Sequence, residues 1–131
     1  MSSVADYAPL LDAFLQGLRD RAEGLLLQPY PQPLAKQARI AAFATRQRWP
    51  SVGGTRYFVD AGGLAAYGGD FAAGWRAAAR YVDRILKGAQ PADLPVEQPI
   101  RFELALNLKT ARALGLTLPQ ALLLRADVVV R

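Results

Sequence analysis

The chain has 131 residues, of which 52% are hydrophobic and 21% are charged, with a net charge of +5. These values fit a single globular domain with one core and exclude a disordered chain. The chain contains no cysteine and no histidine. This excludes disulfides, thiol chemistry, a Ser-His-Asp triad and a histidine-built zinc site.

The excess of basic over acidic residues, with an isoelectric point near 10.0, raises the question of a nucleic-acid partner. No run of five basic residues occurs in the chain. The arginines are spread over the outer faces of different predicted helices, at Arg19, Arg39, Arg46, Arg76, Arg80, Arg84 and Arg112. We therefore interpret the excess charge as solvated surface and predict no nucleic-acid partner.

The amino-terminal region predicts an amphipathic helix over residues 8–21. Apolar side chains recur there at helical spacing, at Tyr7, Leu11, Phe14, Leu15 and Leu18. The first residues lack a basic start, an apolar run and a small-residue cleavage site, so no signal peptide is expected. No apolar run reaches the length needed to span a bilayer.

The next part of the chain alternates strands and helices. Residues 24–28 and 51–53 predict short strands, and residues 33–48 predict the helix between them. One helical turn at residues 57–60 then leads to a third strand at residues 64–67. This alternation indicates an α/β fold with a mainly parallel sheet and right-handed crossovers.

A long helix follows over residues 71–87, with Asp70 as its N-cap and Gly88 as its stop. Its apolar face consists of Phe71, Trp75, Ala78, Val82, Ile85 and Leu86. A connector with regularly spaced prolines comes next, at Pro91, Pro95 and Pro99. Because proline stiffens a connector, residues 70–99 indicate a crossing point between two bodies.

The carboxyl-terminal part predicts one strand and two short helices. Ile100, Phe102, Leu104 and Leu106 alternate with other residues, which indicates a strand over residues 100–107 with one buried face. Helices are expected over residues 108–114 and 120–126.

Residues that follow predicted strands are the candidates for ligand binding, because ligands of open α/β sheets bind beyond the carboxyl ends of the strands. These candidates are Tyr30, Thr55, Arg56, Tyr67, Gly68 and Asp70. Hydroxyls, a guanidinium and a helix N-terminus suit a small anionic or zwitterionic ligand such as an amino acid. In the alternative interpretation, the glycines only form turns and the tyrosines only pack.

Catalytic patterns are absent from the sequence. No glycine-rich nucleotide motif occurs, and Ser2, Ser3 and Ser51 have no histidine partner. No activated nucleophile or metal set can be assembled, so we predict no enzyme, no cofactor and no metal site.

Residues 62–71, GGLAAYGGDF, and the later stretch AARYVDRILKGAQPADLPVEQP resemble the ABC-transporter substrate-binding protein family. The closest matches to the family pattern are Tyr81–Asp83, Ile85–Gly88, Pro91–Pro99 and Asn107–Ala111. The resemblance is looser but continuous from Asp12 to Asp60.

The resemblance implies a three-layer αβα lobe, residues 1–131, of a type I periplasmic-binding fold, in which two lobes close on a solute like a hinge. It also implies delivery of a small solute, such as an amino acid, to an ABC permease. Arg56 would hold a ligand carboxylate, and Tyr30 and Tyr67 would stack or hydrogen-bond. Family members work in the periplasm or at the cell surface, whereas a chain that truly starts at Met1 would be cytoplasmic.

The chain departs from the family pattern at several positions. It is less than half of the family length and corresponds to the carboxyl-terminal lobe or a truncated form. Family members often have Tyr-Pro where this chain has Gly53-Gly54, Glu where it has Tyr57, and Met-Ser where it has Ala65-Ala66.

A second interpretation is a structural remnant that binds no solute and self-associates. The helix face of Phe71, Trp75, Val82 and Leu86 would be a large apolar patch if it were exposed. We therefore expect it to be covered, either by folding back on this lobe or by a homodimer or domain swap.

Overall fold

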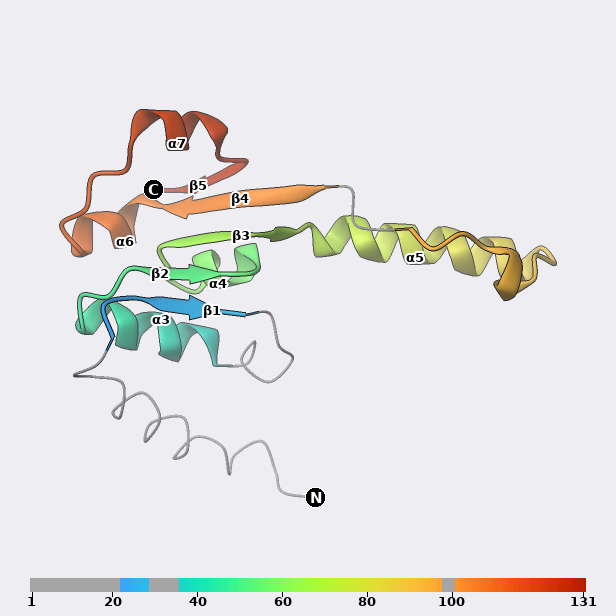
Figure 1. Cartoon of the computed structure of the whole chain (residues 1–131), viewed down its shortest axis with the longest axis horizontal. Helices are drawn as coiled ribbons and strands as arrows, with labels where there is room; N and C mark the ends of the chain where they lie inside the picture. The colour runs from blue at the N-terminus through green and yellow to red at the C-terminus, as the bar shows by residue number, and fades with distance from the viewer. Residues whose placement is uncertain (1–21, 29–35, 98–100) are drawn as a thin grey trace, which may run out of the picture.

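The structure is a computed structural model that describes residues 22–28, 36–97 and 101–131 (Figure 1). The predicted helix over residues 8–21 and the loop that carries Tyr30 lie outside the described residues.

In the described part of the chain, five strands form one sheet in the order β1-β2-β3-β4-β5 (Figure 1). The strands are β1 Leu25–Leu27, β2 Ser51–Gly53, β3 Ala65–Gly69, β4 Phe102–Asn107 and β5 Val128–Val130. β1, β2 and β3 are parallel, β4 is antiparallel to β3, and β5 is parallel to β4. The predicted α/β class with a mainly parallel sheet is confirmed, whereas β5 was not predicted.

Five helices of the described part lie close to their predicted ranges, whereas a short 3-10 turn in the proline connector was not predicted. They are α3 Gln37–Arg46, α4 Arg56–Asp60, α5 Phe71–Leu86, the 3-10 turn η2 Pro91–Asp93, α6 Leu108–Ala113 and α7 Gln120–Arg125. Gly88 and Gly115 follow α5 and α6 with φ angles of 101° and 72°. Only glycine adopts this left-handed backbone readily, so Gly88 ends α5 as predicted, and Gly115 ends α6 in the same way.

The core lies between the sheet and the helices α3 and α4. Ile40 and Ala41 of α3 and Phe58 of α4 form one cluster, against which Leu25 and Leu27 of β1 pack. Val59 of α4 contacts the centre of the sheet, where it clusters with Ala66 and Ala105. This packing fixes the short helix α4 directly above the strands β2, β3 and β4.

The alternating pattern predicted for β4 is only partly correct. Leu106 is fully buried, but Phe102 is 53% exposed, and Ala105, predicted to face outward, is fully buried. The carboxyl-terminal half of β4 pairs with both β3 and β5, whereas Phe102 pairs only with Gly69 of β3. Position along the strand therefore decides burial here more than the alternation of faces does.

The helix α5 and the connector after it extend away from the sheet as an arm (Figure 1). Among the described residues of α5, none is buried. Trp75 is 74% exposed and Leu86 is 82% exposed. The expectation that the face of Phe71, Trp75, Val82 and Leu86 folds back on this lobe is therefore wrong, because the arm leads away from the sheet.

Candidate functional site

A cavity of about 320 Å³ lies at the edge of the sheet where β2 and β3 end. Its lining combines the loop after β2, the helix α4, the start of α5 and the first part of β4. The lining residues are Thr55, Arg56, Tyr57, Asp60, Gly69, Asp70, Phe71, Ala72 and Glu103. Thr55, Arg56 and Asp70, which the sequence selected from separate loops, thus lie around one cavity.

Arg56 lies between two carboxylates. Its Nε is 3.4 Å from Oδ2 of Asp60, one helical turn further along α4. Its Nη1 is 3.5 Å from Oε1 of Glu103 on β4. These contacts hold the guanidinium at the cavity while its charge is already balanced by acidic neighbours.

Thr55 precedes α4 in an extended conformation, with φ of −146° and ψ of 149°. Its side chain is buried, and its Oγ1 has no hydrogen-bond partner among the described residues. A buried hydroxyl without a partner is uncommon, because leaving it unpaired costs free energy. Thr55, which lines the cavity, therefore has a hydroxyl whose donor and acceptor capacity is unused.

Gly68 allows the loop after β2 to approach β3. A Cβ at this position would lie 1.9 Å from the carbonyl oxygen of Gly54. Gly68 also pairs in register with Glu103 across the β3–β4 ladder. The missing side chain thus lets the segment that leads to Arg56 lie close to the strand pair that carries Glu103.

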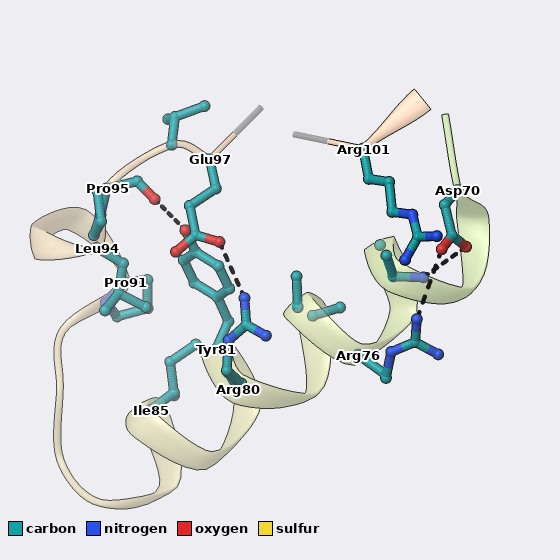
Figure 2. Close-up of a pocket in the computed structure, with 15 residues that line it drawn as sticks. Asp70, Arg76, Arg80, Tyr81, Ile85, Pro91, Leu94, Pro95, Glu97 and Arg101 are labelled. Atoms are coloured by element: carbon teal, nitrogen blue, oxygen red, sulfur yellow. Dashed lines mark hydrogen bonds and ion pairs between the residues drawn. The ribbon is translucent and has the colours of Figure 1, made fainter. Parts of the chain in front are cut away.

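Asp70 caps α5, as the sequence predicted. Its Oδ1 accepts a hydrogen bond of 3.0 Å from the backbone N–H of Ala73. Its Oδ2 lies 3.7 Å from Nη2 of Arg76, and Arg101 lies nearby (Figure 2). The Ala73 hydrogen bond, with the positive charges of Arg76 and Arg101, lowers the pKa of Asp70. The helix N-terminus expected to receive an anionic ligand is therefore already occupied by a carboxylate of the chain.

Tyr67 lies outside this cavity. Its ring stacks on Phe102, with 5.7 Å between the ring centroids and 21° between the ring planes. Both side chains are more than half exposed. The structure thus brings Thr55, Arg56 and Asp70 together around one cavity, whereas Gly68 and Tyr67 do not line it.

A larger hollow of about 740 Å³ separates α5 from the connector (Figure 2). Tyr81 donates a hydrogen bond to the carbonyl oxygen of Pro95, and Arg80 lies 3.5 Å from Glu97. Burial and the neighbouring Glu97 carboxylate raise the pKa of Tyr81. These contacts tie the connector to α5, so this hollow belongs to the structure of the arm.

Sequence reasoning missed Glu103 and treated Asp60 only as a helix end. The spacing of Arg56 and Asp60, four residues apart on one helix, was a signal for their contact. Within the described ranges, no group of three acidic side chains is arranged to hold a metal ion. In the same ranges, no helix combines the length and the apolar character needed to cross a membrane.

Comparison with solved structures shows the same fold in longer chains. A conserved domain protein from Vibrio cholerae has a TM-score of 0.85 and 24% identity, with 97% of this chain and 42% of that chain covered. An ABC domain from Streptococcus pneumonia in complex with L-Trp has a TM-score of 0.85 and 22% identity, with 99% and 43% covered. A ligand-free, open substrate-binding protein with adhesive properties from Clostridium difficile has a TM-score of 0.66 and 17% identity, with 99% and 42% covered.

This chain thus spans less than half the length of these solved chains. A comparison with curated proteins finds no match. Residues 35–130 match the family described as ABC transporter substrate binding protein. That description is of a binding protein, in agreement with the prediction that the chain is not an enzyme. The chain belongs to the family of ABC transporter substrate-binding proteins.

Proposed function

We propose that this lobe binds a small solute, such as an amino acid, at the carboxyl edge of its sheet. The observation that carries the proposal is the cavity at this edge, where Thr55 and Arg56 lie together. The Streptococcus structure of the same fold holds L-Trp, which supports an amino acid as the solute class. In this proposal Arg56 contacts the solute carboxylate through donors left free by Asp60 and Glu103.

The remaining candidates have supporting roles in this proposal. Gly68 positions the loop before Arg56, and Asp70 fixes the start of α5. Tyr67 would contact a solute that extends beyond the cavity, and Tyr30, which lies outside the described residues, stays a candidate from the sequence.

The whole protein would deliver the solute to an ABC permease, in the periplasm or at the cell surface. Residues 70–99 would cross to a second lobe, which closes over the solute. Two observations support this crossing: the exposed arm (Figure 1) and the coverage of only 42% of the related Vibrio chain.

The test is thermal unfolding of the chain with a panel of amino acids and small carboxylates. A solute at one hundred times its dissociation constant adds about 2.7 kcal/mol of stability, which raises the melting temperature by several degrees. Arg56→Ala is expected to reduce this shift, because it removes the guanidinium from the cavity. Arg84→Ala, an exposed arginine on α5, is the matched control. A flat panel would contradict solute binding by this chain, and an unchanged shift in Arg56→Ala would contradict the role of Arg56.

A second candidate function, self-association through α5, is favoured by its exposed face of Phe71, Trp75, Val82 and Leu86. The chain has two tryptophans, and Trp49 is buried in the core. The variant Trp49→Phe therefore leaves Trp75 as the single fluorescent reporter.

If the chain self-associates, Trp75 emission should shift to shorter wavelength as protein concentration rises, because the indole leaves water. Sedimentation should show a dimer in parallel, and Val82→Asp should abolish both changes by placing a charge in the interface. Arg84→Asp on the polar side of α5 is the control. A monomer with water-exposed Trp75 at all concentrations would exclude this function.

A further inference from the structure

The charges around the cavity leave one negative charge in excess. Arg56 contributes one positive charge, and its two ion-pair partners, Asp60 and Glu103, contribute two negative charges. The fourth charged lining residue, Asp70, is engaged by Ala73 and Arg76. A bound anion would add to the excess of negative charge, whereas a bound cation would neutralise it.

Glu103 is the most enclosed of these charged groups. Its side chain is 16% exposed, compared with 44% for Asp60 and 46% for Arg56. Among the described residues, its one ion pair is the 3.5 Å contact with Arg56. A carboxylate accepts several hydrogen bonds, so Glu103 retains acceptor capacity in a position that is largely removed from water.

Thr55, in the lining of the same cavity, carries a second unused acceptor. Its hydroxyl is buried and has no partner among the residues that the structure describes. Gly68, opposite Glu103 in the ladder, lets the backbone of Gly54, just before Thr55, lie close to β3. An ammonium group carries three N–H donors, which matches the acceptors of Glu103, Asp60 and Thr55.

We propose that Glu103, with Asp60 and Thr55, binds the ammonium group of the solute, so that the solute must be an amino acid or another amine. This inference rests on the proposed solute-binding function. Arg56 then acts as the counter-ion that keeps the two carboxylates together, and its remaining donors contact a carboxylate where the solute has one. A plain carboxylic acid is rejected.

Calorimetric titration of the full chain with matched probes tests the ammonium requirement. The first set is L-tryptophan, tryptamine and indole-3-propionate, which differ only in the carboxylate and the ammonium. The second set is L-leucine, isoamylamine and 4-methylpentanoate. It provides a different solute side chain, in case the cavity does not accept the indole ring of the first set. The amino acid and the amine of one set should bind, and the acid should bind at least about tenfold more weakly, as expected for loss of a charged hydrogen bond.

The variant Glu103→Gln tests the residue assignment, because it keeps the shape and removes the charge. It should weaken amine binding at least about tenfold and strengthen binding of the acid, since Arg56 loses one competing carboxylate. Glu97→Gln, on the connector beside Arg80, is the control and should change neither. Unfolding curves of both variants establish that the chain still folds.

The possible failures are distinguishable. If the acid binds as well as the amino acid and the amine does not bind, solute binding stands and the ammonium proposal is overturned. If Glu103→Gln leaves amine binding unchanged, the assignment to Glu103 is overturned. If no probe of either set binds, the proposed function fails for this chain and the ammonium proposal fails with it.

Discussion

Replacing Phe58 with alanine is expected to lower the free energy of unfolding by about 3–5 kcal/mol. Phe58 is fully buried and clusters with Ile40 and Ala41 of α3. Its ring fills the space above two glycines, where a Cβ on Gly53 or Gly63 would come within 2.7 Å or 2.3 Å of the Phe58 side chain. The backbone cannot close around the missing ring without moving β2, so a cavity would remain.

The measurement is equilibrium unfolding in urea, with Phe102→Ala as the matched control. Phe102 loses the same atoms but is 53% exposed, so its replacement should cost less than about 1.5 kcal/mol, mainly the stacking on Tyr67. Because Arg56 and Asp60 lie on the same short helix as Phe58, Phe58→Ala should also weaken solute binding. Equal losses in the two variants would contradict the placement of Phe58 at the centre of the core.

The order of most elements could be predicted because their signals are local. Asp70 and Asn107 cap their helices, and Gly88 and Gly115 end them, through contacts within a few residues. β5 was missed because Val128–Val130 is only a three-residue apolar run. Its strand character comes from pairing with β4, which is more than twenty residues away in the sequence.

Only the part of the site that follows the parallel strands β2 and β3 could be predicted from the sequence. Parallel strands end at one edge, so the loops that contain Thr55, Arg56 and Asp70 were expected together and do line one cavity. Glu103 lies at the beginning of β4, and that beginning reaches the same edge only because β4 is antiparallel to β3. A search of strand ends alone therefore misses it.

The arm shows a different limit of sequence reasoning. The apolar periodicity of α5 predicted a helix and identified its apolar face. Apolar periodicity indicates that one face of a helix favours burial, but it does not identify the surface against which that face packs. In this chain the face of Phe71, Trp75, Val82 and Leu86 stays exposed because α5 leads away from the sheet (Figure 1).

Two glycine-to-alanine replacements should change stability in opposite directions, and the comparison tests the close contact between β3 and the loop after β2. At Gly68 the new Cβ would lie 1.9 Å from the carbonyl oxygen of Gly54. Both groups belong to the backbone, so the strand or the loop must move. We expect Gly68→Ala to lower the free energy of unfolding by about 1–3 kcal/mol or more. At Gly74, in the interior of α5, a Cβ meets no atom within 4 Å, so Gly74→Ala should raise it by about 0.5–1 kcal/mol.

Neither glycine has a left-handed φ angle, so the difference between the two replacements reports available space and not backbone conformation. Urea unfolding of both variants measures this difference in the free energy of unfolding. Solute titration then shows whether the same replacements change binding at the cavity. Gly68→Ala should weaken solute binding because it displaces the loop that carries Thr55 and leads to Arg56, whereas Gly74→Ala should not. A Gly68→Ala protein as stable as the parent would mean that the loop does not lie against β3. In that case the 3.5 Å contact of Arg56 with Glu103 would depend only on the packing of α4 against the sheet, and the loop that carries Thr55 would add nothing to the geometry of the cavity.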